Sequence, residues 1–319
     1  ASRPPQGRSY AFALDISDPR QPALLWEAAL PGSNAGRTRG VVISPLATDP
    51  ARTALFLTTS YAEKTNRTGL PDPDNGAYGL RACALNPRDG SLPWQWSTLY
   101  PAPLTEINTT PAIPAPMDSD GDGRADYLVF GDMAGRLWVL HAASGALFGD
   151  GPAFQLEDGS TQPIGASVTT NGRLVLFGTG GAEHADPEGN YAIYAVEILP
   201  EGAQLRWSYP LEPGEQVWSA PRYDQRGRIY FSTSSGYQPI AAADPGETRG
   251  RLVILNSKGE LQTETTTDSA VPGQVQIGDG LALAVSLSGE VYQFGSHRQQ
   301  TTPAHLASQT LQLLSWRVR

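Results

Sequence analysis

Cysteine is almost absent from this sequence. Cys83 is the single cysteine among 319 residues, so no disulfide can form within the chain. It lies in a short apolar segment that is typical of a strand, which favours a buried thiol over a reactive one.

Histidine and long hydrophobic runs are also scarce. No histidine has a serine and an aspartate at the spacing of a hydrolytic triad. No apolar run is long enough to cross a membrane, and residues 1–5 lack the apolar core of a signal peptide. The net charge of −9 argues against a general nucleic-acid partner. We expect no membrane span and no hydrolase.

Helical periodicity is missing too, while turn-forming residues are abundant. Glycine and proline number 34 and 27, and no segment has the period of an amphipathic helix. Instead, two short apolar runs around a turn containing glycine or proline recur along the chain, often with a tryptophan in the second run. These paired runs are 10–15 with 24–27, 80–85 with 92–96, 136–140 with 146–148, 191–196 with 205–207, 251–255 with 261, and 290–294 with 311–316.

A second pair of short runs precedes most of these hairpins. These runs are 41–45 with 54–58, 111–114 with 127–130, 165–168 with 174–178, 218–221 with 229–232, and 274–277 with 281–284. Each unit therefore has four short strands in roughly 40 to 50 residues, which is the signature of a β-propeller blade.

The repeat predicts an all-β chain, with residues 1–319 forming a single β-propeller domain. Its recurrent phrase, a strand followed by Asp-x-x-x-Gly-x-Leu-x-Trp, resembles the repeat of quinoprotein-type propellers. There are five complete units and one half unit, 10–28, that has only the last two strands of a blade. Because a propeller closes its ring to remove open edges, we expect six or seven four-stranded blades, the first incomplete here, in a C-terminal fragment of a longer protein. We expect the tryptophans to pack in the core, namely Trp26, Trp94, Trp96, Trp138, Trp207 and Trp316.

One acidic stretch carries the clearest chemistry. Residues 118–126 read Asp-Ser-Asp-Gly-Asp-Gly-Arg-Ala-Asp, which places four carboxylates close together. These would repel one another unless a cation neutralised them, and Ca²⁺ takes six to eight oxygen ligands. The predicted ligands are the carboxylates of Asp118, Asp120, Asp122 and Asp126 and the main-chain carbonyl of Arg124.

The stretch resembles an EF-hand loop only in its first half. Gly123 occupies the sixth position, where that loop turns sharply, but Val129 replaces the glutamate of the twelfth position. Asp126 would therefore complete the site, and a strand follows instead of a helix. The alternative interpretation is a solvated acidic turn, and Mg²⁺ suits the loop less well because it demands a tight octahedron.

Several phrases of the sequence resemble PilY-family proteins. Residues 10–27, YAFALDISDPRQPALLWE, are similar to the family's ALDVSDP…LLWE, and the acidic loop running into YLVFGDMAGRLW resembles DxDGDGxxDYxxxGDxxGNLW. QPI at 162–164 followed by LVLFGTG resembles QPI…VxFGTGK, and LSWR at 314–317 resembles the terminal SWRE. The sequence departs from these patterns at Arg136, Gly181 and Val318.

The resemblance implies a calcium-binding C-terminal propeller of a protein at the type IV pilus tip, in the periplasm or at the outer membrane. It implies that calcium occupancy influences pilus extension and retraction, in adhesion, motility or DNA uptake. Minor pilins and the pilus machinery would be the partners, and a host or surface ligand would bind an upstream region that is missing here. On this interpretation the chain is not an enzyme.

Other functions remain open at this point. A propeller scaffold, such as an outer-membrane assembly factor, or an adhesin unrelated to pili would share the repeat. A quinone-dependent dehydrogenase is disfavoured, because the acidic loop connects two strands and a vicinal disulfide is impossible. Two further groups carry metal-ligating side chains without a telling spacing, namely Asp72, Asp74 and Asn75, and His184, Asp186 and Glu188.

Overall fold

The computed structural model describes residues 9–30, 41–47, 49–62, 78–100, 112–156, 162–182, 185–237, 247–278, 281–294 and 299–301. Within these ranges the chain forms β-strands, turns and connecting segments, with no α-helix. None of the described segments is therefore a helix that could span a membrane. The predicted all-β class is confirmed.

The described strands form one two-stranded sheet and five four-stranded sheets, all antiparallel. The two-stranded sheet, which we call the half blade, contains β1 (Ser9–Asp15) and β2 (Ala23–Leu30). The four-stranded sheets are called blades 1 to 5 in chain order. In each of them, strands that are consecutive in the chain are hydrogen-bonded neighbours.

The strand bounds follow this order. Blade 1 has β3 (Val41–Leu46), β4 (Asp49–Ala62), β5 (Tyr78–Leu85) and β6 (Trp94–Tyr100). Blade 2 has β7 (Ala115–Met117), β8 (Tyr127–Gly131), β9 (Arg136–His141) and β10 (Phe154–Gln155). Blade 3 has β11 (Thr169–Asn171), β12 (Leu174–Gly178), β13 (Ala192–Leu199) and β14 (Gly202–Pro210). Blade 4 has β15 (Arg222–Tyr223), β16 (Ile229–Ser232), β17 (Gly250–Leu255) and β18 (Leu261–Thr267). Blade 5 has β19 (Gln276–Gly278), β20 (Leu281–Val285), β21 (Val291–Phe294) and β22 (Gln299–Thr301).

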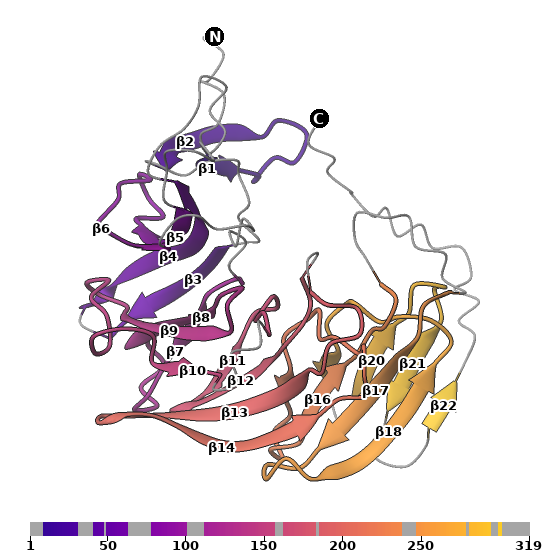
Figure 1. Cartoon of the computed structure of the whole chain (residues 1–319). Coiled ribbons are helices and arrows are strands. Elements are labelled where there is room, and N and C mark those ends of the chain that lie inside the picture. The colour runs from indigo at the N-terminus through magenta and orange to yellow at the C-terminus, as the bar shows by residue number, and fades with distance from the viewer. Residues whose placement is uncertain are drawn as a thin grey trace.

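The sheets follow one another around an arc in chain order, from the half blade through blades 1, 2, 3 and 4 to blade 5 (Figure 1). In blades 1 and 3 the first strands lie on the inner side of the arc, and the fourth strands β6 and β14 lie on its outer side. This is the arrangement of a β-propeller, as the repeat predicted.

The hydrophobic core lies between neighbouring sheets. Trp26 of the half blade packs in one cluster with Leu57 of blade 1, and Leu80 of blade 1 shares another cluster with Phe130 of blade 2. Three more clusters join blades 2 and 3, blades 3 and 4, and blades 4 and 5. Each large side chain buried in this way stabilises the fold by about 1.5–3 kcal/mol, so the stacking of sheets is the main source of stability.

Three tryptophans, in β2, β6 and β14, fix the last strand of their own sheet to the next sheet along the chain. Their indole N–H groups donate to main-chain carbonyls in the turn between the third and fourth strands of that sheet. The pairs are Trp26 to Pro87 at 2.9 Å, Trp94 to Ala142 at 2.9 Å and Trp207 to Ser257 at 3.2 Å. The prediction that tryptophans pack in the core is confirmed. Trp26, Trp94 and Trp138 are buried, and Trp96 and Trp207 are partly buried against core clusters, whereas Trp316 lies outside the described residues.

Some strand positions predicted from the sequence are wrong. The first strands of blades 2, 3 and 4 begin after the apolar runs 111–114, 165–168 and 218–221. The fourth strand of blade 2 is Phe154–Gln155, and the predicted run 146–148 pairs with β9 only through an isolated antiparallel bridge between Leu147 and Leu140. Those early runs are apolar because they are buried where one blade leads to the next. Val168 of the run 165–168, for example, is buried and packs in the cluster that joins blades 2 and 3. In blade 5 the fourth strand is Gln299–Thr301, and residues 311–316 lie outside the described part of the chain.

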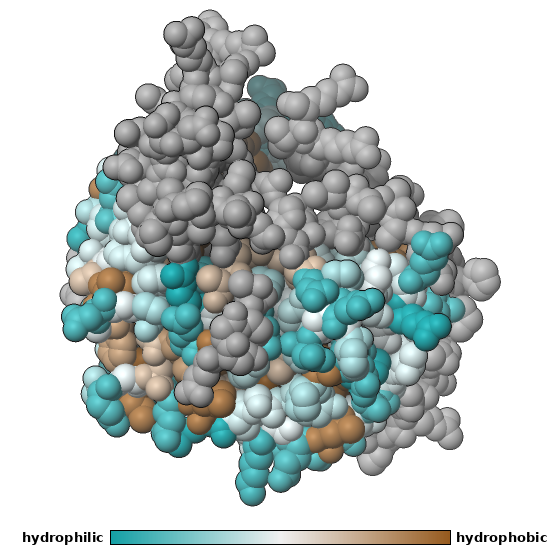
Figure 2. Space-filling model, viewed as in Figure 1, coloured by the Kyte–Doolittle hydropathy of each residue, from teal (hydrophilic) through white to brown (hydrophobic). Residues whose placement is uncertain are grey.

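Figure 2 shows hydrophilic and hydrophobic residues interleaved over the described surface in this view. Exposed apolar side chains concentrate on the half blade and the adjoining β3, where Phe12, Leu14, Ile16, Leu25 and Ile43 are among the exposed large hydrophobic residues.

Candidate metal centre

The acidic loop connects the first two strands of blade 2 and is held firmly at its C-terminal end. The N–H of Asp126 donates to the carbonyl of Met117 at 2.9 Å, which closes the loop at its base. The carbonyl of Asp126 accepts the N–H of Ala142 at 2.9 Å, in the turn after β9. The loop therefore starts and ends on ordered strands of one blade.

The same loop is bonded to the neighbouring blade. Ala125 is buried, donates its N–H to the carbonyl of Pro45 at 2.9 Å and accepts the N–H of Ala47 at 3.2 Å. Leu46 and Ala125 thus form a parallel β-bridge between blades 1 and 2. Any change in the order of the loop would consequently be felt at the contact between these two blades.

Three of the predicted carboxylates converge. One oxygen from each of Asp118, Asp120 and Asp126 lies within 4.8 Å of the others. Two oxygens on opposite sides of a calcium ion can be at most about 5 Å apart, because each Ca–O distance is about 2.3–2.6 Å. The spacing of these oxygens therefore fits a shared cation, and Asp118 and Asp126 are half-buried while Asp120 is exposed.

Main-chain N–H groups orient the first of these carboxylates. Asp118 accepts hydrogen bonds from Gly121 at 2.7 Å, Gly123 at 2.7 Å and Asp122 at 3.1 Å. Gly121 and Gly123 both have a backbone φ of +83°, a conformation that residues other than glycine rarely adopt. Desolvation raises the pKa of Asp118, but the N–H donations from Gly123, Gly121 and Asp122 together outweigh it and lower that pKa below its usual range. The carboxylate is therefore charged and preorganised.

Ser119 orients the carboxylate of Asp126, the last aspartate of the loop. Its main-chain N–H and its hydroxyl both donate to one oxygen of Asp126, at 2.8 and 2.6 Å. This leaves the other oxygen of Asp126 for a cation. Ser119 was not among the predicted site residues, although its place between two aspartates offers a signal, because a serine hydroxyl is a donor that a nearby carboxylate can accept.

Asp122 and Arg124 are paired with each other. The Asp122 carboxylate accepts the main-chain N–H of Arg124 at 2.9 Å and its guanidinium at 3.1 Å. Both side chains are about one-third exposed, with relative exposures of 35% and 36%, and such a surface pair contributes only about 0–1 kcal/mol. Metal ligation by the Asp122 carboxylate and the Arg124 carbonyl remains a prediction, and the cost of releasing Asp122 is small.

The other candidate groups do not assemble a second site in the described part of the chain. Asp72, Asp74, Asn75 and His184 lie outside the described residues. His141 is exposed and its ring lies 5.0 Å from that of Tyr127. Cys83 is fully buried, which confirms that prediction, and burial raises the pKa of its thiol to about 12. A thiol with that pKa is protonated at neutral pH.

Two buried acidic groups were not foreseen as structural centres. The Asp132 carboxylate accepts the Arg136 guanidinium at 2.8 Å and the Trp138 indole N–H at 2.9 Å. The Glu215 carboxylate, before β15, binds Arg251 of β17 through two guanidinium nitrogens. The sequence signal for the Asp132 site is the pattern Asp-x-x-x-Arg-x-aromatic. The pattern recurs at Asp224, whose carboxylate likewise accepts the guanidinium of Arg228.

No family model matches the chain, and no curated protein matches it. Among solved structures, the chain is similar to the C-terminal domain of Pseudomonas aeruginosa PilY1, with a TM-score of 0.58, 15% identity, and coverage of 93% of this chain and 79% of that one. It is also similar to Sqt1 of Saccharomyces cerevisiae, with a TM-score of 0.50, 11% identity, and coverage of 92% and 78%. BamB of Moraxella catarrhalis matches with a TM-score of 0.43, 14% identity, and coverage of 89% and 79%.

Quinoprotein dehydrogenases are also among the matching structures, with TM-scores of 0.43 and 0.47 for two of them. At these identities the likeness concerns the fold alone. The similarity to the PilY1 domain establishes a propeller of that general kind.

Proposed function

We propose that this chain is a calcium-binding, non-catalytic propeller module of a type IV pilus tip or biogenesis protein. The observation that carries the proposal is the convergence of Asp118, Asp120 and Asp126 in a loop that is bonded to the neighbouring blade. Within the described residues, no arginine or lysine pairs with these three carboxylates, so a bound cation is the natural source of neutralisation.

The residues present fit calcium. Carboxylates from Asp118, Asp120 and Asp126 would supply hard oxygen ligands, and Asp122 and the Arg124 carbonyl would complete the coordination. Bound calcium would supply positive charge that cancels their repulsion. The chain's own contribution is to fix the loop through the Ala125 bridge, so that loop order is transmitted to the surface where blades 1 and 2 meet.

The pilus part of the proposal is supported by the PilY-like phrases of the sequence and by the fold of the PilY1 domain. On this proposal the protein acts outside the cytoplasm, at the pilus tip, in the periplasm or at the outer membrane. Minor pilins and the pilus machinery would be its partners, and calcium occupancy would bias pili between extension and retraction.

Calorimetry tests the calcium site directly. We expect saturable binding of one Ca²⁺ by the unmodified chain, and loss of binding in Asp120→Asn. Asp150→Asn is the matched control, because Asp150 is an exposed aspartate outside the acidic loop. Absence of binding by the unmodified chain would refute the calcium site.

A cellular experiment tests the pilus role separately. The source organism, with its own gene deleted, would be complemented with the unmodified gene, with Asp120→Asn or with Asp150→Asn. We expect surface pili and twitching to be restored by the unmodified gene and by the control, and to be altered with Asp120→Asn. If deletion changes neither pili nor motility while calcium binds in vitro, the domain is a calcium-stabilised scaffold or adhesin unrelated to pili.

A further inference from the structure

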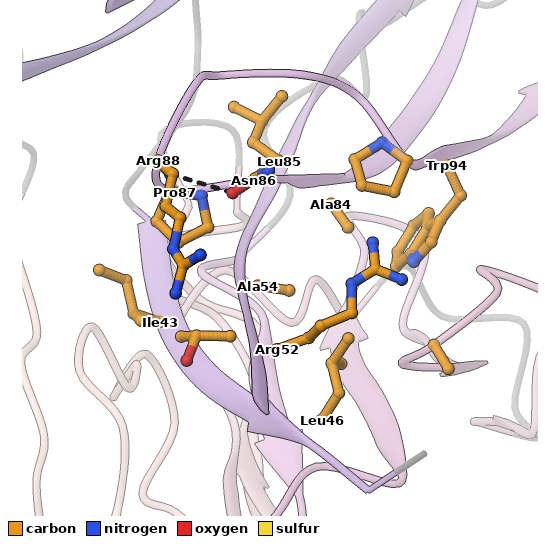
Figure 3. A pocket seen from close by; sticks show the side chains of 13 residues that line it. Ile43, Leu46, Arg52, Ala54, Ala84, Leu85, Asn86, Pro87, Arg88 and Trp94 are labelled. Carbon is orange, nitrogen blue, oxygen red and sulfur yellow. Dashed lines mark hydrogen bonds between the residues drawn. The ribbon is translucent and has the colours of Figure 1, made fainter. Parts of the chain in front are cut away.

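A cavity of about 480 Å³ lies at one end of blade 1, against the turn after β9 in blade 2 (Figure 3). Its volume is within the range of small-molecule sites, which is about 300–1,000 Å³. Ile43, Leu46, Leu85 and Trp94 supply large apolar side chains to its wall. Ile43 and Trp94 lie on opposite sides of the view, so an apolar group in the cavity would meet hydrophobic surface on both sides.

The two charged residues of the described lining are both exposed to water. Arg52 already takes part in another interaction, and Arg88 lies on the turn between β5 and β6. Long cationic side chains of this kind keep their charged ends hydrated and lay their apolar stems against neighbouring surface. The surface that the cavity offers to a ligand is therefore mainly apolar, and an uncharged molecule suits it.

The wall of the cavity belongs to the same core cluster as part of the acidic loop. Leu46, Ala54 and Trp94 of the lining pack in one hydrophobic cluster with Ala125 and Ala142. Ala125 is a residue of the acidic loop, and Ala142 follows β9. Because close-packed clusters transmit strain, a change in the loop would shift side chains that line the cavity.

Hydrogen bonds give this connection a direct route. The N–H of Ala142 donates to the carbonyl of Asp126 at 2.9 Å, and the carbonyl of Ala142 accepts the indole N–H of Trp94 at 2.9 Å. Leu46 is held separately, through its parallel β-bridge with Ala125. Two lining residues are therefore positioned by the end of the acidic loop, one through Ala142 and the other through the bridge.

We propose that this cavity binds an uncharged apolar molecule, and that calcium in the acidic loop raises its affinity. The ligand class is an aromatic or branched aliphatic compound, because such a molecule gains from the apolar wall and requires no ionic partner. Bound calcium would fix Ala125 and Asp126. These residues in turn would hold Leu46 and Trp94 in the arrangement that forms the wall. The coupling rests on the proposed calcium site, whereas the cavity does not.

The size of the coupling follows from thermodynamic linkage. A wall that is already ordered spares the ligand part of the ordering cost of binding. Coupling between two sites is reciprocal, so a ligand whose affinity calcium raises must raise the affinity for calcium by the same factor. We expect a factor of about five to ten, in the lower part of the range typical of coupled sites.

The probe is N-phenylnaphthylamine, an uncharged aromatic compound whose fluorescence increases in apolar surroundings. We expect saturable binding in the presence of calcium, with a dissociation constant on the order of 10–100 μM for a ligand of this size. Removal of calcium with a chelator should weaken binding about five- to tenfold. Fluorescence titration measures both affinities, and the indole N–H resonance of Trp94 reports whether the probe occupies the cavity.

Ala143→Phe is the test variant for the cavity, because Ala143 lines it and is exposed on a turn. The added ring should occupy the space and weaken probe binding about tenfold or more, with an unchanged thermal midpoint. Ala146→Phe, at an exposed alanine of the same turn outside the described lining, should bind the probe normally. Ile43→Ala removes apolar wall at an exposed position and should weaken binding about threefold.

Asp120→Asn is the test variant for the coupling. It should bind the probe equally well with and without calcium, because it removes one of the three converging carboxylates. Asp150→Asn, at an exposed aspartate outside the acidic loop, should retain the calcium-dependent difference. In the reciprocal experiment, saturating probe should tighten calcium binding by the same factor in calorimetry.

The outcomes separate this proposal from the calcium site on which its coupling rests. The cavity is refuted if the probe does not bind saturably, or if Ala143→Phe and Ile43→Ala both retain full affinity. Calcium binding that leaves probe affinity unchanged refutes the coupling alone. Absence of calcium binding in calorimetry refutes the proposed calcium site and the coupling together, while the Ala143→Phe result still decides the cavity.

Discussion

The indole N–H of Trp94 in blade 1 donates to the main-chain carbonyl of Ala142 in blade 2, with 2.9 Å between nitrogen and oxygen. The same ring lies against Gly145, where an added Cβ atom would come within 2.4 Å of the Trp94 Cε3 atom. Ring and turn are therefore complementary in both polarity and shape. Trp26 with Gly90 and Trp207 with Gly259 repeat the arrangement, so each recurring Trp contacts the recurring turn of the next sheet.

Trp94→Phe should lower the free energy of unfolding by about 2–3 kcal/mol, because it removes the bond to Ala142 and leaves that carbonyl unsatisfied in a buried contact. Urea unfolding measures the change. Trp218→Phe is the control, because the Trp218 indole nitrogen is buried without a hydrogen-bond partner among the described residues. Its loss should be under about 1 kcal/mol. Equal losses in the two variants would contradict a role for the hydrogen bond.

Gly145→Ala should be more destabilising than Gly149→Ala. Both glycines have positive φ, +71° and +81°, so the conformational strain of about 1–2 kcal/mol is shared. Only at Gly145 does the new methyl group collide with a ring, whereas nothing lies within 4 Å at Gly149. We expect an additional loss of about 1–3 kcal/mol from the collision. Thermal unfolding measures both variants. Equal midpoints of Gly145→Ala and Gly149→Ala would contradict a close contact between Gly145 and the Trp94 ring.

Removing the buried partner of Arg251 should cost far more than removing the exposed one. Glu215 has a side-chain exposure of 9%, and Glu264, which binds the same guanidinium at 2.7 Å, has 43%. We expect Glu215→Ala to lower the free energy of unfolding by about 3–5 kcal/mol, because it removes the buried partner of a largely buried arginine and leaves only the exposed Glu264 beside it. Glu264→Ala should cost about 0–1 kcal/mol. Denaturant unfolding distinguishes these outcomes, and the reverse order would show that Glu215 is not the principal partner.

Asp224 should make stability depend on pH in the acid range. Desolvation raises its pKa, but hydrogen bonds from Arg228 and Arg226 outweigh it and lower the pKa below 3.8. A depressed pKa in the folded state stabilises the protein above the unfolded pKa, and this stabilisation is lost as pH falls through the folded pKa.

Asp224→Asn should therefore destabilise the chain at pH 7 by about 1–2 kcal/mol, with the difference shrinking below about pH 4. Thermal unfolding across this pH range measures the difference. Asp150→Asn, at an exposed aspartate, should show no such pH-dependent difference. A constant difference at all pH values would contradict the lowered pKa.

Calcium should raise the thermal midpoint, and above the dissociation constant the rise should follow the logarithm of the calcium concentration. By mass action, a ligand at about 100 times its dissociation constant adds about 2.7 kcal/mol to the free energy of unfolding. Asp118→Asn should abolish the rise, because Asp118 is one of the three converging carboxylates. Asp15→Asn, at an exposed turn of the half blade, should retain it. A rise of the same size in both variants would place the stabilising ion elsewhere.

Much of the fold could be predicted because local patterns determine blades. Short alternating runs separated by glycine or proline turns gave five complete units and a half unit, and the described sheets have that composition. The beginnings of blades were misplaced for a physical reason. An apolar run between blades is buried by the neighbouring sheet, as Val168 is, and sequence alone cannot separate this burial from that of a strand.

For the candidate metal centre, the sequence determined which groups are close. Aspartates at positions 118, 120 and 126 meet because a glycine-containing turn folds a nine-residue segment back on itself, which is a local effect. Only the tertiary structure decided that Asp122 pairs with Arg124, that Ser119 bonds to Asp126, and that Ala125 joins the loop to blade 1.

The sequence by itself determined the strand repeat, the acidic loop and the buried character of Cys83, because each depends on residues adjacent in the chain. Only the tertiary structure decided the contact of Trp94 with Ala142 and the pairing of Glu215 with Arg251. These partners are 36 or more positions apart, and they meet because stacked sheets place distant turns side by side, which no local pattern encodes.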